Sequence, residues 1–116
     1  MEISKHEDGS MAILNLAGRL DLASGSHLKE EIKKLFEKNI TSIHLNLSKV
    51  EFINSSGLGS LVSIMKEIRL LKGRLTLSNL AGYVQEIFDI TQLSHIFEIY
   101  TTEQEALSSY QTIPAN

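Results

Sequence analysis

The sequence of 116 residues contains no cysteine, no tryptophan and only one proline, Pro114. The absence of cysteine excludes disulfides, thiol nucleophiles, iron–sulfur clusters and cysteine-ligated zinc sites. Because the only proline lies near the end of the chain, no proline interrupts the helices or strands before it. A chain of this length corresponds to about one domain, which can bury roughly two thirds of its unfolded surface in a single core.

Long hydrophobic runs and clusters of positive charge are missing as well. The longest stretch without a charged residue, residues 52–65, is too short and too rich in serine and glycine to cross a bilayer. Residues 1–8 lack the apolar core of a secretory signal. The net charge is −3, and no lysine- or arginine-rich stripe favours nucleic acid. We therefore expect a cytoplasmic protein that binds neither nucleic acid nor a membrane.

The hydrophobic periodicity predicts a hairpin followed by alternating helices and strands. The turn signal Asp8-Gly9 separates two strands, and Ser24 or Ser26 is the expected N-cap of the first helix. Asn79 is a candidate cap for the third helix, and Thr102 with Glu105 forms a capping-box pattern for the fourth. The expected strands are residues 2–6, 11–16, 43–47, 75–77 and 96–100, with a connection at 48–54 and helices before residue 39, over 58–72, around 84–88 and over 103–110.

This order, β-β-α-β-α-β-α-β-α, predicts an α/β fold. The sheet is expected to be mixed and mainly parallel, with an N-terminal hairpin, and to be covered by about four α-helices. Residues 1–110 are expected to form a single domain. Residues 111–116 are expected to form a flexible tail.

One segment, residues 52–60, stands out because it joins a strand to a helix with the sequence Phe-Ile-Asn-Ser-Ser-Gly-Leu-Gly-Ser. Asn54 and Ser55 are both good N-caps, and the amides that follow them lack intrahelical partners. A helix N-terminus stabilises negative charge by about 0.3–1 kcal/mol, so these hydroxyls lie where a phosphate group is tolerated. Spacing alone nevertheless favours the simpler interpretation, a serine-rich cap whose glycines pack on the sheet.

Known catalytic and cofactor motifs do not fit the sequence. A dinucleotide fingerprint needs a glycine at the position of Val62, and neither a Gly-Lys-Ser/Thr loop nor a Gly-x-Ser-x-Gly elbow occurs. We therefore expect no enzyme, no catalytic residue, no cofactor and no metal site. Asp21, before the first helix, is either a turn carboxylate or a partner contact. The four histidines show no metal-site spacing and are interpreted as surface or strand-flanking residues: His6, His27, His44 and His95.

Four local patterns resemble the STAS family, in particular the bacterial anti-sigma factor antagonists. Residues 18–21 (Gly-Arg-Leu-Asp) are similar to the family's Gly-x-Leu/Ile-Asp turn, and residues 45–48 (Leu-Asn-Leu-Ser) to its Leu-Asp-Leu-Ser strand end. Residues 52–59 resemble Phe-Ile-Asp-Ser-Ser-Gly-Leu-Gly, which is the most specific of the patterns. Residues 75–80, followed by Leu93 and Ile96-Phe97, resemble the late strand and the segment after it. The resemblance covers residues 3–107 and implies a single STAS domain.

The resemblance implies a partner-switching function in which the protein is a substrate and a ligand rather than an enzyme. The first serine of the motif, here Ser55 with Ser56 as a backup, is expected to be phosphorylated by an anti-sigma factor that is also a Ser/Thr kinase. The unphosphorylated protein, a monomer when free, is expected to bind that kinase and release the sigma factor, and a PP2C-type phosphatase is expected to restore it. The expected partner contacts are Asp21, Asn54, Ser55, Ser56, Gly57 and Leu58.

Two departures from the family pattern matter. Asn46 and Asn54 stand where the family usually has aspartate. Asn54 keeps the ability to cap the helix but lacks the carboxylate. This difference supports an alternative, in which the chain is a STAS scaffold without a phosphorylation switch, or a subunit-like module of another regulatory or transport assembly.

Overall fold

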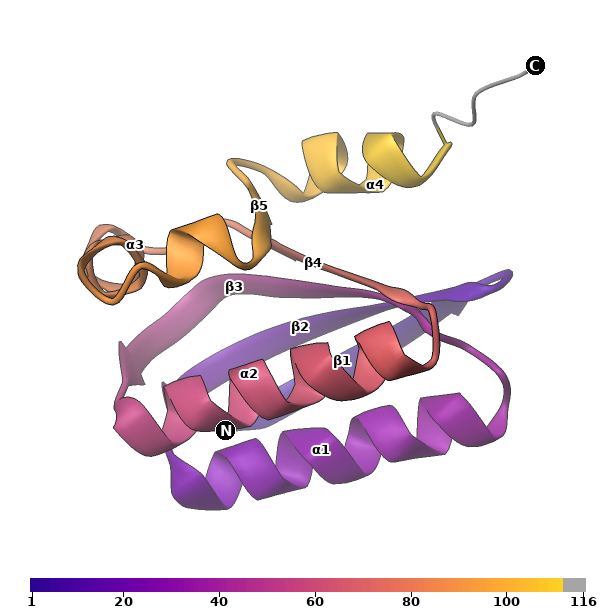
Figure 1. Ribbon diagram of the computed structural model, residues 1–116, viewed down its shortest axis with the longest axis horizontal. Coiled ribbons are helices and arrows are strands. Elements are labelled where there is room, and N and C mark those ends of the chain that lie inside the picture. Colours follow the sequence, from indigo (N-terminus) through magenta and orange to yellow (C-terminus); the bar gives the residue numbers. More distant parts are fainter. Residues whose placement is uncertain (112–116) are drawn as a thin grey trace.

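A five-stranded mixed sheet organises residues 1–111, the part of the chain that the computed structural model describes (Figure 1). The strands lie in the order β1-β2-β3-β4-β5; β1 and β2 are antiparallel and all other neighbours are parallel. The predicted mixed α/β fold and its order of elements are confirmed. The elements are β1 (Glu2–Asp8), β2 (Met11–Leu20), α1 (Leu22–Glu37), β3 (Ser42–Ile53), α2 (Ser55–Leu70), β4 (Arg74–Ser78), α3 (Gly82–Ile90), the 3₁₀ turn η1 (Leu93–His95), β5 (Glu98–Tyr100) and α4 (Glu103–Gln111).

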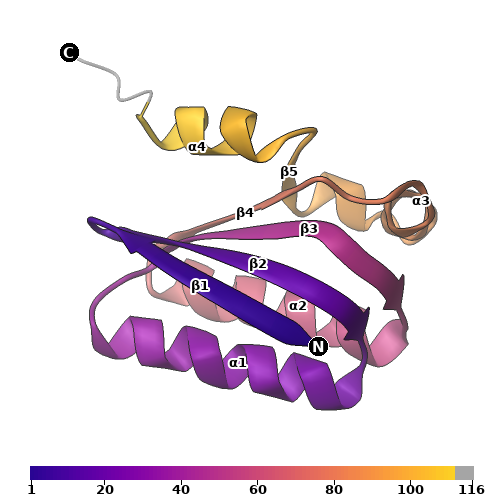
Figure 2. The ribbon, with the colours of Figure 1, turned by 180° about the vertical axis from the view of Figure 1, so that it is seen from behind.

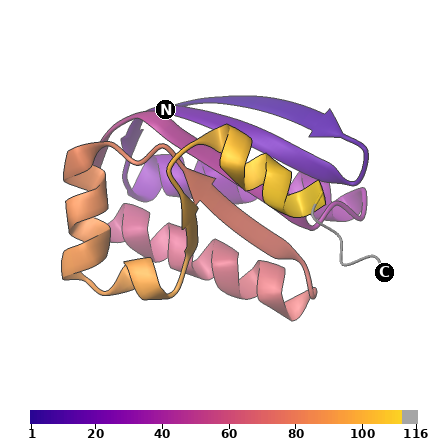
Figure 3. The same ribbon diagram turned by 90° about the horizontal axis from the view of Figure 1, so that it is seen from above.

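The helices are distributed over both faces of the sheet. Helices α1 and α2 lie side by side beneath it, whereas α4 lies on the opposite face (Figures 1 and 2). Helix α4 contacts β3, β4 and β5, and β1 and β2 lie beyond it when the molecule is seen from above (Figure 3). Helix α3 lies near the end of β3, where the Tyr83 hydroxyl donates a hydrogen bond to the carbonyl of Ile53 over 3.2 Å.

The main core lies between the sheet and helices α1 and α2. Alternating residues of the central strands are buried there, together with Leu28, Ile32 and Leu35 of α1 and Leu61, Ile64 and Ile68 of α2. Each such aliphatic side chain contributes about 1.5–3 kcal/mol relative to an exposed position. On β3 and β4 the buried apolar residues are Ile43, Leu45, Leu47, Val50, Ile53, Leu75 and Leu77.

Strands β2 and β3 continue beyond their predicted ends. Residues 17–20, which follow the predicted strand 11–16, and residues 48–53, predicted as part of a connection, both belong to the sheet. Their pairing register shifts between Asn15 and Ala17 and again between Gly18 and Arg19. Such bulges break the strict alternation of buried and exposed residues, which is why the periodicity indicated shorter strands.

Two predicted helix starts are corrected. Helix α1 begins at Leu22 after Asp21, rather than after Ser24 or Ser26, and α3 begins after Ala81 rather than Asn79. Asn79 instead has a left-handed backbone with φ of 59°. Helix α4 includes Gln111, and the rest of the predicted tail, 112–116, lies outside the described residues. Within residues 1–111, no helix is long and apolar enough to span a membrane.

Candidate functional site

The parallel pairing of β2 and β3 brings the beginnings of two helices together. Arg19 pairs with Phe52 and Leu20 with Ile53 at the carboxyl ends of these strands. The amide of Asn54 then donates to the carbonyl of Leu20 over 3.3 Å. Helices α1 and α2 both start at this edge of the sheet (Figures 1 and 2). Their N-caps, Asp21 and Asn54, therefore belong to one surface region, which we call the cap edge.

Asn54 fixes the start of α2 and leaves two serines open to solvent. Its Oδ1 accepts a hydrogen bond from the amide of Gly57 over 2.9 Å, and its carbonyl accepts from Leu58. Ser55 is the first residue of the helix, and both Ser55 and Ser56 are exposed. The first amides of a helix lack intrahelical acceptors, so a negatively charged group on either hydroxyl would lie at the positive end of the helix dipole.

Asp21 is a structural cap. Its Oδ1 accepts from the amide of Ser24 over 3.1 Å, while the Ser24 hydroxyl accepts from the amide of Asp21 over 2.9 Å. This capping box was not predicted, because Ser24 was interpreted as the cap itself. The hydrogen bonds from Ser24, backbone first, lower the pKa of the Asp21 carboxyl. Asp21 is therefore held ionised at the cap edge, and it is only partly buried there.

The glycines of the motif have different roles. A Cβ atom placed on Gly57 would lie 2.1 Å from the carbonyl oxygen of Leu20, so α2 approaches β2 more closely than any other residue would permit. A Cβ on Gly59 would meet nothing within 4 Å. Of the predicted contact residues, Gly57 is buried and Leu58 is half-buried. Gly57 thus acts through the packing of the helix.

The sequence did not predict the apolar and aromatic residues that border the cap edge. Leu22, directly after Asp21, keeps 67% of its surface exposed, and Tyr83 reaches the end of β3 from α3 with 44% exposed. The guanidinium of Arg19 lies 3.8 Å from the centre of the Phe52 ring, in a cation–π contact. Arg19 and Phe52 are brought together by strand pairing between distant parts of the sequence, which a short motif cannot predict.

Asn46, the second departure from the family pattern, lies away from the cap edge. Its Nδ2 donates to Glu103 of α4 over 2.8 Å, and its Oδ1 accepts from the amide of Ser48 over 2.9 Å. An amide supplies a donor to the Glu103 carboxylate, whereas an aspartate at this position would bring two like charges together. Asn46 therefore connects β3 to α4.

The cap role of Asn54 can be tested by two substitutions. Asn54→Ala removes the acceptor for the Gly57 amide and is expected to lower the free energy of unfolding by about 1 kcal/mol. Asn54→Asp keeps the acceptor and adds a charge that the helix dipole favours, so stability should be unchanged or rise by about 0.3–1 kcal/mol. Urea denaturation at pH 7 measures both changes. Equal stability of the alanine variant and the parent would contradict the assigned cap.

The described residues offer no acidic or histidine cluster that could hold a metal ion, since no three such side chains in residues 1–111 are suitably grouped. His44 departs from the expected surface position. It belongs to β3 and is fully buried, with Nδ1 2.8 Å from the Thr76 hydroxyl and Nε2 2.8 Å from the Ser78 hydroxyl of β4. Burial lowers the pKa of His44 to about 4, and Glu103 partly opposes that shift.

Comparisons with known proteins agree with this arrangement. The STAS domain family model matches residues 2–106. The chain is 34% identical over 86 residues to the anti-sigma-B factor antagonist of Bacillus subtilis, covering 74% of this chain and 78% of the relative. It is 30% identical over 101 residues to the anti-sigma-B factor antagonist of Listeria monocytogenes, covering 87% and 89% of the two chains.

A solved structure supports the same fold. The anti-sigma factor antagonist SpoIIAA of Bacillus, in its unphosphorylated form, has a TM-score of 0.76 at 23% identity, with 97% of this chain and 100% of that chain covered. SpoIIAA has also been solved in a phosphorylated form. The family model, the two sequence relatives and this shared fold lead to one conclusion: the chain belongs to the STAS domain family, among the anti-sigma factor antagonists.

Proposed function

We propose that the protein is a regulatory binding protein that captures an anti-sigma factor with Ser/Thr kinase activity in the cytoplasm, and that phosphorylation of Ser55 ends this capture. A single observation carries the proposal. Ser55 is the exposed first residue of α2, directly after the cap Asn54, in the segment that resembles the family motif. Ser56 is the backup acceptor, and a PP2C-type phosphatase restores the unmodified protein.

The cap edge is suited to a reversible charge change. Phosphate adds about −1.5 to −2 charges at pH 7. At the start of α2 this charge meets the helix dipole, so the domain accepts it without unfolding. In a packed interface the same charge is desolvated, and it repels any carboxylate of the partner that lies next to it. A penalty of about 2.8 kcal/mol corresponds to roughly a hundredfold loss of affinity.

The partner contacts of this proposal are the exposed and half-exposed residues of the cap edge. Asp21, Asn54, Ser55 and Ser56 supply polar groups, and Leu58 supplies an apolar one. Leu22 and Tyr83 add exposed apolar surface next to them. The names of the two sequence relatives support an anti-sigma factor as the partner, and the phosphorylated form of SpoIIAA supports a phosphorylation step.

Asn54 favours a second candidate function. If a carboxylate at this position helps a kinase engage the neighbouring hydroxyl, its replacement by an amide removes that help. The chain would then bind its partner constitutively, as a scaffold or as a subunit-like module of a larger regulatory or transport assembly. Rapid phosphorylation of Asn54→Asp, together with slow phosphorylation of the parent protein, would favour this candidate.

Site-resolved mass spectrometry tests the proposal directly. The protein is incubated with ATP and each candidate anti-sigma kinase from the same genome, in parallel with Ser55→Ala and the neighbouring control Ser56→Ala. Phosphate is expected on Ser55 in the parent and in the Ser56 control. In Ser55→Ala the phosphate on position 55 is lost, and any phosphate that remains should lie on the backup acceptor Ser56. Calorimetry with the same kinase should show roughly a hundredfold weaker binding after phosphorylation. Equal affinity of the two forms would refute the switch.

A further inference from the structure

The face of the sheet opposite the main core is polar. Eight alternate residues of β3, β4 and β5 point to this side, as the strand register requires, and each carries a hydrogen-bonding group. They are Ser42, His44, Asn46, Arg74, Thr76, Ser78, Glu98 and Tyr100. We call them the polar floor. Helix α4 lies on this floor, and His44, Thr76 and Ser78 have no exposed surface beneath it.

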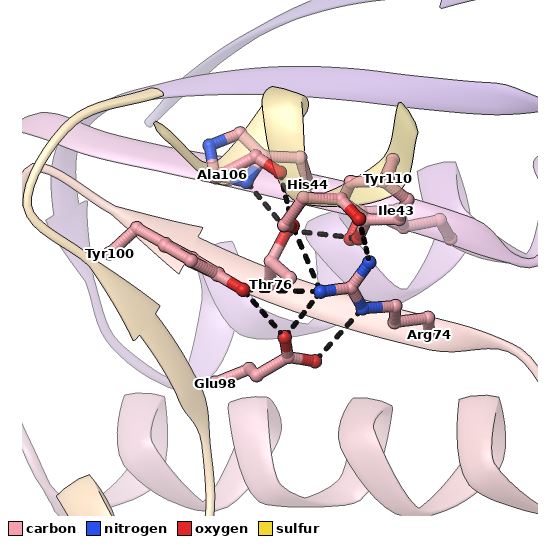
Figure 4. Close-up of polar contacts among 9 residues, drawn as sticks. Ile43, His44, Arg74, Thr76, Glu98, Tyr100, Ala106 and Tyr110 are labelled. Carbon is pink, nitrogen blue, oxygen red and sulfur yellow. Dashed lines mark hydrogen bonds and ion pairs between the residues drawn. The ribbon is translucent and has the colours of Figure 1, made fainter. Parts of the chain in front are cut away.

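Side-chain hydrogen bonds hold α4 on the polar floor (Figure 4). The Tyr110 hydroxyl donates to the carbonyl of Ile43 over 3.0 Å and lies 2.9 Å from the Thr76 hydroxyl. Arg74 donates to the Ser109 hydroxyl over 2.9 Å, and its guanidinium lies 4.3 Å from the centre of the Tyr110 ring. Arg74 is itself fixed by an ion pair with Glu98, and at the other end of the helix Glu103 accepts from Asn46.

These hydrogen bonds form a chain with one direction. Because Tyr110 donates its proton to Ile43, the Thr76 hydroxyl must donate to Tyr110 and accept from Nδ1 of His44. Nε2 of the neutral imidazole then accepts from the Ser78 hydroxyl. We assign this tautomer from the hydrogen-bond network. These hydrogen bonds join β4, β3 and α4, and the last of them runs from Tyr110 to the carbonyl of Ile43.

Helix α4 contributes little to the apolar core. Ala106 is its one fully buried residue, whereas α1 buries Leu28, Ile32 and Leu35. Detaching α4 would therefore expose hydroxyls, an imidazole and a guanidinium, all of which water can satisfy. The net contribution of such hydrogen bonds is small when water replaces the lost partner. An isolated helix of nine residues is not stable, so α4 would unwind when it detaches.

We propose that α4 is a latch, which opens as a separate unit while the sheet, α1 and α2 remain folded. Tyr110 closes the latch, because it makes contacts with both β3 and β4. In the open state the polar floor is exposed to solvent, whereas the main core and the cap edge stay folded. This inference does not depend on the proposed function, since the cap edge lies at the start of α2 and contributes no residue to the latch.

Native-state hydrogen exchange of the full chain tests the latch. The amides of Ala106 and Leu107 are expected to exchange at least a hundredfold faster, relative to their intrinsic rates, than those of Leu45 and Leu47 in β3. Their exchange should depend little on urea below the unfolding transition, because opening α4 exposes little surface. A single rate and a single urea dependence for α4 and β3 would overturn the proposal.

Two matched variants separate local opening from global unfolding. Ile32→Val, in α1, weakens the main core and should reduce the protection of the β3 amides about fivefold, within the range for a buried Ile→Val change. It should leave the α4 amides unchanged, since α1 stays folded in the open state. Tyr110→Phe removes the latch hydrogen bonds and should reduce the protection of the α4 amides about fivefold or more. If Ile32→Val reduced protection equally in α4 and β3, α4 would open only by global unfolding.

Discussion

Replacing Gly57 by alanine is expected to destabilise the domain by about 3 kcal/mol, the upper part of the range for overpacking a close contact. The added Cβ would lie 2.1 Å from the carbonyl oxygen of Leu20, which is backbone and cannot rotate away. That carbonyl also accepts the hydrogen bond from Asn54, so the clash would displace the cap of α2 together with the end of β2. Urea denaturation monitored by circular dichroism gives the change in the free energy of unfolding.

Gly59→Ala is the matched control, two residues further along the same helix. Its Cβ would meet nothing within 4 Å. Alanine is favoured over glycine in a helix by about 0.5–1 kcal/mol, so this variant should be slightly more stable than the parent. Equal denaturation midpoints for the two variants would show that α2 does not approach β2 as closely as described.

Stability is expected to fall by about 3 kcal/mol as the pH is lowered from 7 to 4, owing to His44. Burial lowers the pKa of this imidazole to about 4 in the folded protein, while in the unfolded chain it keeps its ordinary value of 6.5. Between these values the unfolded state binds more protons than the folded state. The contribution of His44 is therefore complete above pH 6.5 and is lost as the pH falls towards 4.

The measurement compares the parent with His44→Gln, which keeps hydrogen-bonding groups between Thr76 and Ser78 but does not titrate in this range. Urea denaturation at intervals between pH 7.5 and 4.5 should give a much flatter profile for the glutamine variant. The carboxyl groups with lowered pKa, such as Glu31 near 2, lose their contribution at lower pH and affect both proteins equally. Parallel profiles, or an NMR titration of His44 with a midpoint near 6.5, would contradict its burial.

The sequence predicted the order of elements because most helices and strands carry an undisturbed period. The pattern of Ile43, Leu45 and Leu47 indicated β3, and Thr102 with Glu105 indicated the start of α4, where each accepts from the other's backbone amide. Bulges hid the ends of β2 and β3, because a bulge reverses the alternation without any change in composition. The start of α1 was misplaced because a capping box and a serine cap use the same residues.

The candidate site, too, was predictable from sequence only in part. Asn54, Ser55 and Ser56 lie within one short segment, so their joint location at a helix start was predictable from sequence. Tyr83 and the burial of His44 depend on contacts between residues about 30 positions apart, which no local pattern encodes. His44 and Asn46 alternate with apolar residues like any solvent-facing strand positions. Only the placement of α4 shows that this polar side is covered.

The two outer strands of the sheet bear on how the protein behaves at high concentration. An exposed strand edge is a template for pairing with another chain, and natural sheets protect it with charge or by keeping it short. On β1, Lys5 forms an ion pair with Glu31 of α1, and Glu7 forms one with Lys38, the residue directly after that helix. Strand β5 has only three residues. Pairing of edge strands between two copies of the domain is therefore disfavoured at both edges of the sheet, so we expect concentrated protein not to form fibres through these edges.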